Sequence, residues 1–546
     1  MTTPKLRAAS SRWAPALAGS AAGAVALAAS ELFAGLFGAT SLIVAVGALA
    51  IDLQPPGAKD VVVSLFGTND KAALIGLIIG LAIAFAAVAG ILGAGRFSVG
   101  AAVFVVFGAV AAGAAIRSPL VDPVFAVINA ALAVSAGLVT LRFLLRELGA
   151  LPVVSVSAPS DETHPAATDG ARSGSPRGTP GRGPEATSPE WTRRRFLIAS
   201  AGTIGVAAVA GGIGRSLLDA DHVEGVVSTS SLPKPLMAVP PLAPDQLITM
   251  PGLTPLVVPN DAFYRIDTAL QVPHMDLATW QLSVTGMVDR PLTFTYDELL
   301  TMPLHEQYVT ISCVSNRVGE NLVGNALWTG VRLKDVLEAA GVQQGATQII
   351  GRSVDRFTAG FPTSWAMAPG REALVAVGMN REPLPANHGF PARLIVPGLY
   401  GSVSATKWLS EIELTTREAV DGYWVPLGWA KDAPILTQSR VDLPPPGARV
   451  APGPIDVAGV AWAPDRGVAG VEVRIDDGPW QQARITQPIS KATWVQWTFP
   501  WTAGVAGRHG IEVRATDDTG DVQTDEVSDP APDGARGHHR IFVVVA

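Results

Sequence analysis

The residues most able to do chemistry lie in a short stretch around position 313. Cys313 is the only cysteine in the 546 residues, and Asn316 and Arg317 follow it closely. A single cysteine cannot form an internal disulfide, and a tetrahedral zinc site needs several further ligands. Because it stands at the end of the apolar run 309–311, one residue beyond it, we expect it where a strand ends in a polar loop. A free cysteine is more often a small buried hydrophobic side chain, so its sequence neighbours must decide its role.

Length and composition set the number and kind of domains. A chain of 546 residues is too long for one hydrophobic core, so two or three domains are expected. The mean hydropathy of +0.32 is high for a soluble protein, yet 16% of the residues are charged. These values predict membrane segments joined to a globular part. The net charge of -7, without a basic tract interleaved with aromatic residues, excludes a nucleic-acid partner.

Four nearly charge-free stretches are long enough to cross ~30 Å of hydrocarbon as helices. They are Trp13 to Phe37, Ala72 to Gly93, Val99 to Ile116 and Pro123 to Leu141. The run from Ser41 to Leu53 is too short, and we interpret it as an extracytoplasmic interfacial or re-entrant segment. Basic residues precede the first stretch, separate the second from the third and follow the fourth, which places those ends in the cytoplasm. Residues 1–150 are therefore predicted to form a four-span helical anchor in the cell membrane.

The first histidine of the chain is His164. A haem held by two histidines inside the helical region is therefore excluded, and no haem is predicted in this chain. We expect the helices to serve as an anchor rather than to carry electrons.

A second membrane-related signal follows a stretch of low complexity. Residues 151–191 are rich in Pro, Gly, Ser, Thr and Ala, which predicts a flexible cytoplasmic linker. Residues 192–216 begin with an Arg-Arg-x-Phe-Leu pattern before an apolar run, which resembles a twin-arginine export signal. An ordinary span with basic flanks is the alternative. We expect this segment to remain as a fifth span, so that the chain from Leu217 onward lies outside the cytoplasm.

The rest of the chain divides into two parts with different periodicities. Residues 233–437 mix strands and helices, which indicates an α+β domain. Its strands are expected at 280–286, 392–396 and 411–414, and its helices at 296–300 and 333–341. Residues 438–546 have only strand signals, at 471–475, 494–499, 511–515 and 541–545, with a turn at Asp477-Gly478. This part is predicted to be an all-β, immunoglobulin-like sandwich.

Four segments, taken in order, resemble the sulfite oxidase family of molybdopterin-dependent oxidoreductases, in a membrane-anchored bacterial form. They are residues 312–317 with 326–333, then 382–393, 405–409 and 459–462. Any one of them alone would be weak, but together they run from roughly residue 260 to the C-terminus in the order of the family. The resemblance implies a molybdopterin-binding oxidoreductase domain at 233–437 and a dimerisation domain at 438–546.

The resemblance also implies a set of site residues. In that family one cysteine is a thiolate ligand of molybdenum held by one pterin dithiolene, and Cys313 stands in its place; soft sulfur suits such a metal. The implied cofactor contacts are Phe263, Tyr264, Arg265, Asn316, Arg317, Asp355, His388, Arg393, Ala405, Thr406 and Lys407. Arg265 and Arg466 match substrate-orienting positions, so the predicted catalytic residues are Cys313, Arg265 and Arg466.

Three places depart from the family pattern. Ile266-Asp267 follow the pocket arginine where Asn-His is usual, Val318 replaces a second arginine, and Phe357 replaces an active-site tyrosine. Loss of one charge-assisted hydrogen bond weakens anion binding by ~1.5–3 kcal/mol. The substitutions therefore predict a pocket that is less suited to a small dianion such as sulfite.

The sequence thus predicts a membrane-anchored, extracytoplasmic oxidoreductase that transfers an oxygen atom and two electrons on a small oxo-anion or sulfur compound. Its cofactor would be one molybdenum on one molybdopterin. A homodimer and a separate electron-transfer partner, a cytochrome or a quinone-linked protein, are expected. Two alternatives stay open: an oxide reductase of sulfoxide type that runs the transfer in reverse, and a cofactor-free binding module.

Overall fold

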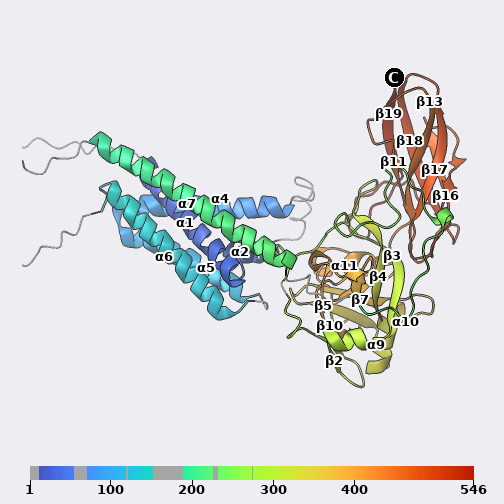
Figure 1. The fold of residues 1–546 in the computed structure, drawn as a ribbon, viewed down its shortest axis with the longest axis horizontal. Coiled ribbons are helices and arrows are strands. Elements are labelled where there is room, and N and C mark those ends of the chain that lie inside the picture. Colours follow the sequence, from blue (N-terminus) through green and yellow to red (C-terminus); the bar gives the residue numbers. More distant parts are fainter. Residues whose placement is uncertain (1–11, 55–69, 119–120, 152–188, 225–231, 274) are drawn as a thin grey trace, which may run out of the picture. The chain divides into compact units, whose positions relative to one another are not determined.

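The computed structural model describes residues 12–54, 70–118, 121–151, 189–224, 232–273 and 275–546. The chain forms two compact units, a helical one that ends at Asp221 and a β-rich one that runs from His222 to Ala546 (Figure 1). Most of the predicted linker, as far as residue 188, lies outside the described residues.

The described part of the helical unit is built from apolar helices. They are α1 (Trp13–Phe37), α2 (Leu42–Asp52), α4 (Asp70–Gly95), α5 (Phe97–Ile116), α6 (Pro123–Glu147) and α7 (Pro189–Glu224). All except α2 are long and apolar enough to cross a membrane, judged by length and composition. The four helical stretches predicted at the start of the chain are confirmed as helices. The predicted signal segment, residues 192–216, lies inside the longer α7.

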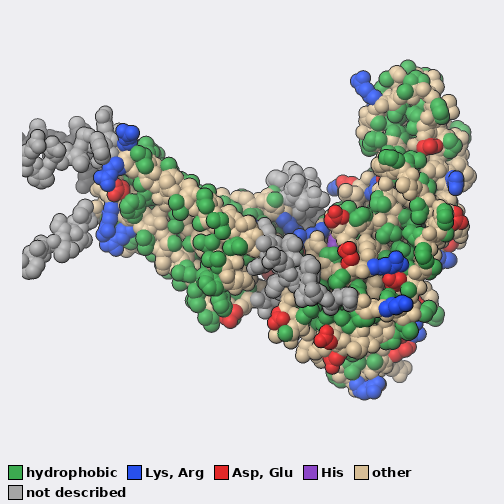
Figure 2. Space-filling model, in the orientation of Figure 1, with side chains coloured by type: hydrophobic (Ala, Val, Ile, Leu, Met, Phe, Trp, Pro, Cys, Tyr) green, Lys and Arg blue, Asp and Glu red, His purple; other side chains and the backbone are tan. Residues whose placement is uncertain are grey.

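Small residues let these helices approach closely. Gly90 of α4 faces α1, and a Cβ added there would lie 2.1 Å from the carbonyl oxygen of Pro15. Gly214 of α7 also packs on α1, where an added Cβ would lie 2.5 Å from the carbonyl oxygen of Glu31. The large apolar side chains mostly point outward, and hydrophobic side chains cover much of this unit in Figure 2. Close contact between small residues is a way for helices to pack without a core of large side chains.

The β-rich unit begins with two five-stranded sheets of order β2-β1-β10-β5-β6 and β3-β4-β7-β8, with β9 paired to β7. The strands are β1 (Gln281–Gly286), β2 (Leu292–Thr295), β3 (Leu304–Ser312), β4 (Val323–Arg332), β5 (Gln348–Ser353), β6 (Thr358–Pro362), β7 (Leu374–Met379), β8 (Glu382–Pro383), β9 (Arg393–Ile395) and β10 (Leu409–Thr415). The helices are α8 (Tyr296–Thr301), α9 (Leu333–Ala340), α10 (Thr363–Met367) and α11 (Gly401–Ser404). The strands and helices predicted for this part are confirmed. Gly341, at φ +72°, ends α9.

The C-terminal region, Gln438–Ala546, forms two further sheets of order β11-β13-β17-β16 and β12-β19-β18-β14-β15. Their strands are β11 (Gln438–Leu443), β12 (Arg449–Val450), β13 (Gly453–Trp462), β14 (Val468–Ile475), β15 (Gln481–Gln482), β16 (Arg484–Ile485), β17 (Val495–Ala503), β18 (Gly507–Asp517) and β19 (His539–Val545). Side chains of both sheets, among them Val457, Trp497 and Val513, share one hydrophobic core, so the sheets pack face to face. The predicted strands and the turn at Asp477-Gly478 are confirmed.

A second core joins the C-terminal region to the sheets that precede it. Trp462 and Trp494 are fully buried in the same cluster as Trp328 of β4. The indole N–H of Trp494 donates to the carbonyl oxygen of Leu256 (2.7 Å), and its backbone N–H donates to the Thr310 hydroxyl on β3 (2.8 Å). Since β3 leads directly to Cys313, the C-terminal region takes part in fixing that strand.

Candidate functional site

The cysteine loop (Cys313–Leu322) connects β3 to β4 and folds back on itself. The backbone N–H of Cys313 donates to the carbonyl oxygen of Leu322 (2.9 Å), whose own N–H donates to Asn316 Oδ1 (2.8 Å). Cys313 Sγ lies 2.9 Å from Ser315 Oγ, and the cysteine is 8% exposed. Cys313 therefore does lie at the end of a strand, as predicted, and Asn316 holds the loop rather than extending from it.

Two phenols, the partly buried Tyr264 and the buried Tyr400, lie within electrostatic reach of the thiol. Burial raises the pKa of Tyr264, and negative charge on Cys313 raises it further, while Arg393 acts in the opposite direction. Burial, with a smaller contribution from Cys313, also raises the pKa of Tyr400 to about 12. Both phenols therefore stay protonated at neutral pH and can donate hydrogen bonds beside a thiolate.

Three of the predicted cofactor contacts form a cationic cluster. Arg265 Nε and Lys407 Nζ donate to the same oxygen, Asp267 Oδ2, at 3.0 and 2.5 Å. Burial lowers the pKa of Lys407 to about 8 and that of Arg393 to about 10. Arg393 Nη1 donates to the carbonyl oxygen of His388 (3.0 Å), but its buried Nε makes no hydrogen bond with the described residues. The cluster therefore retains a buried donor for a further acceptor.

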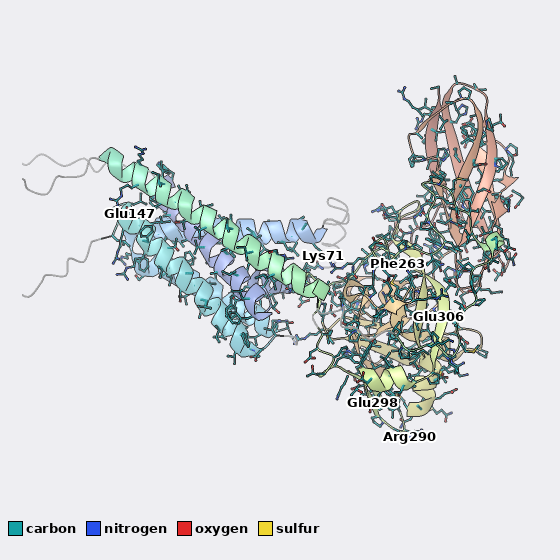
Figure 3. The ribbon with its side chains drawn as sticks, in the orientation of Figure 1. Lys71, Glu147, Phe263, Arg290, Glu298 and Glu306 are labelled. Carbon is teal, nitrogen blue, oxygen red and sulfur yellow. The ribbon has the colours of Figure 1, made fainter. Side chains whose placement is uncertain are left out.

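Aromatic rings form one wall of this cluster. Phe263, labelled in Figure 3, stacks on Tyr264 with ring centroids 5.2 Å apart and meets the His388 ring edge-on at 5.7 Å. His388 Nε2 lies 2.8 Å from the carbonyl oxygen of Asn260, and burial lowers the pKa of this imidazole to about 4. The histidine is therefore neutral at pH 7 and donates from Nε2. The rings thus form a packed aromatic group in which Phe263 and Tyr264 are stacked and His388 stands nearly perpendicular to Phe263.

Two further predicted contacts, Ala405 and Thr406, directly precede Lys407 of this cluster in the chain. Thr406 Oγ1 donates to a backbone carbonyl of β5 (3.3 Å), and the N–H of Ala405 donates to one of α11 (3.1 Å). Burial raises the pKa of Asp355, on which Asp267 and Lys407 also act electrostatically. The structure thus brings together residues that are more than 100 positions apart in the sequence.

Two predicted site residues are engaged elsewhere. Arg317 Nη1 donates to Asp529 at 2.7 Å, and its side chain is 52% exposed. Arg466 Nε donates to Asp517 (2.7 Å), and its Nη2 donates to the carbonyl oxygen of Ile435 and to Thr437 Oγ1 (both 3.0 Å). These contacts connect Arg466 to β18 and to the segment just before the C-terminal region. Its role in orienting substrate stays a prediction.

Sequence reasoning missed Tyr400, which lies within electrostatic reach of the thiol, and a charged pair beside this phenol. The pair is Arg536 with Asp533 at 2.7 Å, and both residues act electrostatically on Tyr400. Gly534, at φ +114°, packs on the phenol, because an added Cβ would lie 2.6 Å from Tyr400 Oη. In the sequence, Gly534 next to Asp533 was the only local signal of this contact, and such a pair does not indicate proximity to Cys313.

The donor set fits a molybdopterin. A phosphate and a polar heterocycle need fixed cations and buried N–H donors, which Arg265, Lys407 and the unpaired Nε of Arg393 provide. A thiolate suits molybdenum. The described residues contain no group of three or more His, Cys, Asp or Glu side chains that could hold a metal ion, so pterin sulfurs would have to complete the coordination of a metal at Cys313.

Comparisons with known proteins agree with this geometry. Residues 269–424 match the family model described as oxidoreductase molybdopterin binding domain. Sulfite oxidase of Gallus gallus is 31% identical over 343 residues, which cover 54% of this chain and 72% of that protein. Mitochondrial sulfite oxidase of Mus musculus is 29% identical over 343 residues, covering 54% of this chain and 61% of that protein.

A protein whose name states a different activity is also similar. Nitrate reductase [NADH] 1 of Oryza sativa subsp. japonica is 34% identical over 216 residues, covering 35% of this chain and 23% of that protein. The matched part of the chain thus spans less than two thirds of the mouse relative's length. The extent of the match to the chicken protein and the matching domain model show that this chain belongs to the sulfite oxidase family of molybdopterin-binding oxidoreductases.

Proposed function

We propose that this chain is a molybdenum-cofactor oxidoreductase of sulfite oxidase type that acts on a small oxo-anion or sulfur compound. The observation that carries the proposal is one buried thiol, Cys313, close to a buried cluster in which Arg393 Nε has no acceptor among the described residues. When bound, the cofactor supplies two-electron oxygen-atom transfer. The protein supplies position and charge.

The proposed roles of the residues follow from their contacts. Cys313 holds the metal, and Arg265, Arg393 and Lys407 hold the phosphate and the polar edge of the pterin. Tyr264 and Tyr400 remain protonated and donate hydrogen bonds near the thiolate.

Molybdenum content and a conservative substitution test this function. Full-length protein from a host that makes the cofactor should contain close to one molybdenum per chain, and Cys313→Ser should abolish turnover while the chain stays folded. An alcohol is a harder and poorer ligand than a thiolate. Molybdenum below about a tenth of an atom per chain would instead favour the cofactor-free binding module, and wild-type turnover in the serine variant would refute the ligand.

The side chains at two expected substrate positions favour a second candidate function, a reductase that acts on a neutral oxide such as a sulfoxide. Phe357 and Val318 are half-buried and carry no charge or hydroxyl, and the ring of Phe357 lies 5.8 Å from that of Tyr423. We expect sulfite to be a poor substrate, and Phe357→Tyr with Val318→Arg to raise kcat/KM for sulfite. One preorganised donor is worth ~2.7–4 kcal/mol, and a grafted pair should give less. Fast sulfite oxidation by the wild type would contradict this inference.

We infer a membrane-anchored organisation from the five apolar helices. Residues 1–150 would form a four-span anchor, 151–191 a cytoplasmic linker and 192–216 a retained twin-arginine-like span, with residues 233–437 and an immunoglobulin-like dimerisation domain, 438–546, outside the cytoplasm. A separate cytochrome or quinone-linked protein would exchange the electrons. A reporter fused after Gly214 should lie outside the cytoplasm, and one fused within 166–183 should lie in the cytoplasm. Finding both reporters on the same side of the membrane would overturn this topology.

A further inference from the structure

Arg440 of β11 extends from the C-terminal region to the cysteine loop. Its Nη1 donates to the carbonyl oxygen of Glu320 at 2.8 Å. Its Nε donates to Asp442 (2.6 Å) and its Nη2 to Thr254 Oγ1 (2.7 Å), and the residue is only 7% exposed. Each nitrogen of the guanidinium thus donates to a different partner. A lysine offers a point charge and cannot reproduce this planar fork.

His539, the first residue of β19, supports the same loop from one side. Gly319 has φ +83°, and a Cβ added to it would lie 2.3 Å from the imidazole Cδ2. The ring is fixed because its Nδ1 accepts the backbone N–H of Val441 at 3.0 Å. Burial, followed by the effect of Arg440, lowers the pKa of His539 to about 4, so the ring is neutral and carries its proton on Nε2. The loop lies on this ring at a distance that only glycine permits.

A third contact between the cysteine loop and the C-terminal region is weaker. Arg317 pairs with Asp529 at 2.7 Å, but their side chains are 52% and 80% exposed. Exposed ion pairs of this kind contribute ~0–1 kcal/mol and are screened by salt. Arg440 and His539 therefore carry most of the attachment.

Hydrogen bonds connect the Glu320 end of the loop to the residue that carries the thiol. Glu320 is hydrogen-bonded to Arg317 through its N–H (3.0 Å), and two residues later Leu322 bonds both Asn316 and the backbone N–H of Cys313. We propose that Arg440 and His539 are positioning residues that hold the sulfur of Cys313 in place, so that the C-terminal region completes the site and does more than mediate assembly. The proposal deepens the proposed function, in which Cys313 is the metal ligand.

Because Cys313 is the only cysteine, its rate of reaction reports the position of the loop without a contribution from other thiols. The test measures the rate of alkylation by iodoacetamide in the full-length, cofactor-free protein, with circular dichroism as the check of folding. Arg440→Lys should raise the rate by about tenfold, the effect of losing one charge-assisted hydrogen bond on a local opening equilibrium. Asp529→Asn is the matched control, which removes the exposed pair and should change the rate by less than about twofold.

A double-mutant cycle isolates the second contact. Gly319→Ala should raise the alkylation rate, because the new methyl group collides with the His539 ring. The backbone strain of alanine at positive φ is the same with or without that ring, so only the collision should disappear in Gly319→Ala/His539→Ala. Non-additivity of the two substitutions supports the proposal. Additive effects would exclude His539 as a positioning residue.

The outcomes separate this inference from the proposed function. If folded Arg440→Lys and Gly319→Ala both react at the wild-type rate, the positioning role is wrong, whatever the enzyme does. If Arg440→Lys does not fold, the Gly319 cycle decides alone. In the cofactor-loaded chain, Arg440→Lys should lower kcat more than it changes KM, at matched molybdenum content. Faster alkylation with unaltered kcat would show that the loop moves but that its position does not matter for turnover. That result would also overturn the proposal.

Discussion

The two units of this chain differ in how many of their large apolar side chains are exposed. In the helical unit many glycines and alanines lie inside, together with a few large side chains such as Leu141, whereas Leu77 is 59% and Val206 70% exposed. In the β-rich unit, Trp328, Trp494 and Trp497 have no exposed surface. Burial of large apolar groups stabilises a fold in water. An arrangement with these groups outside and small ones at the helix contacts fits a hydrocarbon surrounding, which is the environment proposed for the helical unit.

The largest effect should come from the core of the β-rich unit. Trp494→Ala removes a fully buried indole and its hydrogen bond to Leu256, and should destabilise this unit by ~3–5 kcal/mol. Trp13→Ala is the matched change in the helical unit, where the side chain is 51% exposed, and should have little effect. Thermal unfolding of the purified full chain compares them. Equal losses for the two variants would contradict the difference between the units.

Two equally exposed valines test the surroundings directly. Val206 of α7 is 70% exposed, and Val505 of the C-terminal region is 69% exposed. If α7 spans a membrane, Val206→Asp should disfavour insertion by ~2.5–3.5 kcal/mol, whereas Val505→Asp should be almost neutral in water. Because the other four apolar helices would keep either variant in the membrane, the measurement is the fraction of each variant in which a reporter fused after Ala546 lies outside the cytoplasm. Similar behaviour of both variants would remove the case for a hydrocarbon surrounding.

Adding volume at a helix contact should destabilise the helical unit, because small residues there pack against the backbone of a neighbouring helix. Gly90→Leu places a side chain where even a Cβ would lie 2.1 Å from the backbone of α1, and should cost ~1–3 kcal/mol or separate the helices. Gly76→Leu on the same helix is the control, since an added Cβ there has no neighbour within 4 Å. Thermal stability in detergent should fall for Gly90→Leu alone. Tolerance of both variants would mean that α1 and α4 do not pack as described.

The smallest effect concerns acid sensitivity, which we expect to arise in the β-rich unit. Burial lowers the pKa of both His388 and His539 to about 4, whereas an unfolded histidine titrates near 6.5. As the pH falls from about 6.5 to about 4, the unfolded chain binds protons that the folded chain does not, so stability decreases. The slope is at most ~1.4 kcal/mol per pH unit for each histidine, and the contribution is complete above about pH 6.5.

Denaturant unfolding of the full chain between pH 7.5 and 5 measures this slope. His388→Gln should flatten it. His509→Gln should not, because the hydrogen bond that His509 donates to Asp476 raises the pKa of His509 and gives that residue the opposite sign. An unchanged slope in His388→Gln would show that this imidazole is not buried in its neutral form.

Local sequence signals predicted most elements, because they depend on the spacing of neighbouring residues. The apolar stretch Trp13–Phe37 coincides with α1, and the periodicity of residues 333–341 gave α9 with its terminal glycine. The end of a strand at Cys313 was also visible from its flanking residues. The order of strands in the sheets was not visible from the sequence, since β1 pairs in parallel with β10, more than 100 residues later. Pairing at such a distance leaves no periodic trace.

By itself, the sequence determined the apolar helices, the mixed and all-β character of the later parts and, through the resemblance, the family and the candidate site residues. Only the tertiary structure decided how those residues are joined. Asp267 binds both Arg265 and Lys407, Arg466 is committed to Asp517, and Arg440 reaches Glu320 across 120 positions. The physical reason is that helix and strand formation follow from local spacing, whereas a buried charge takes its partner from whichever segment the fold brings within hydrogen-bonding distance.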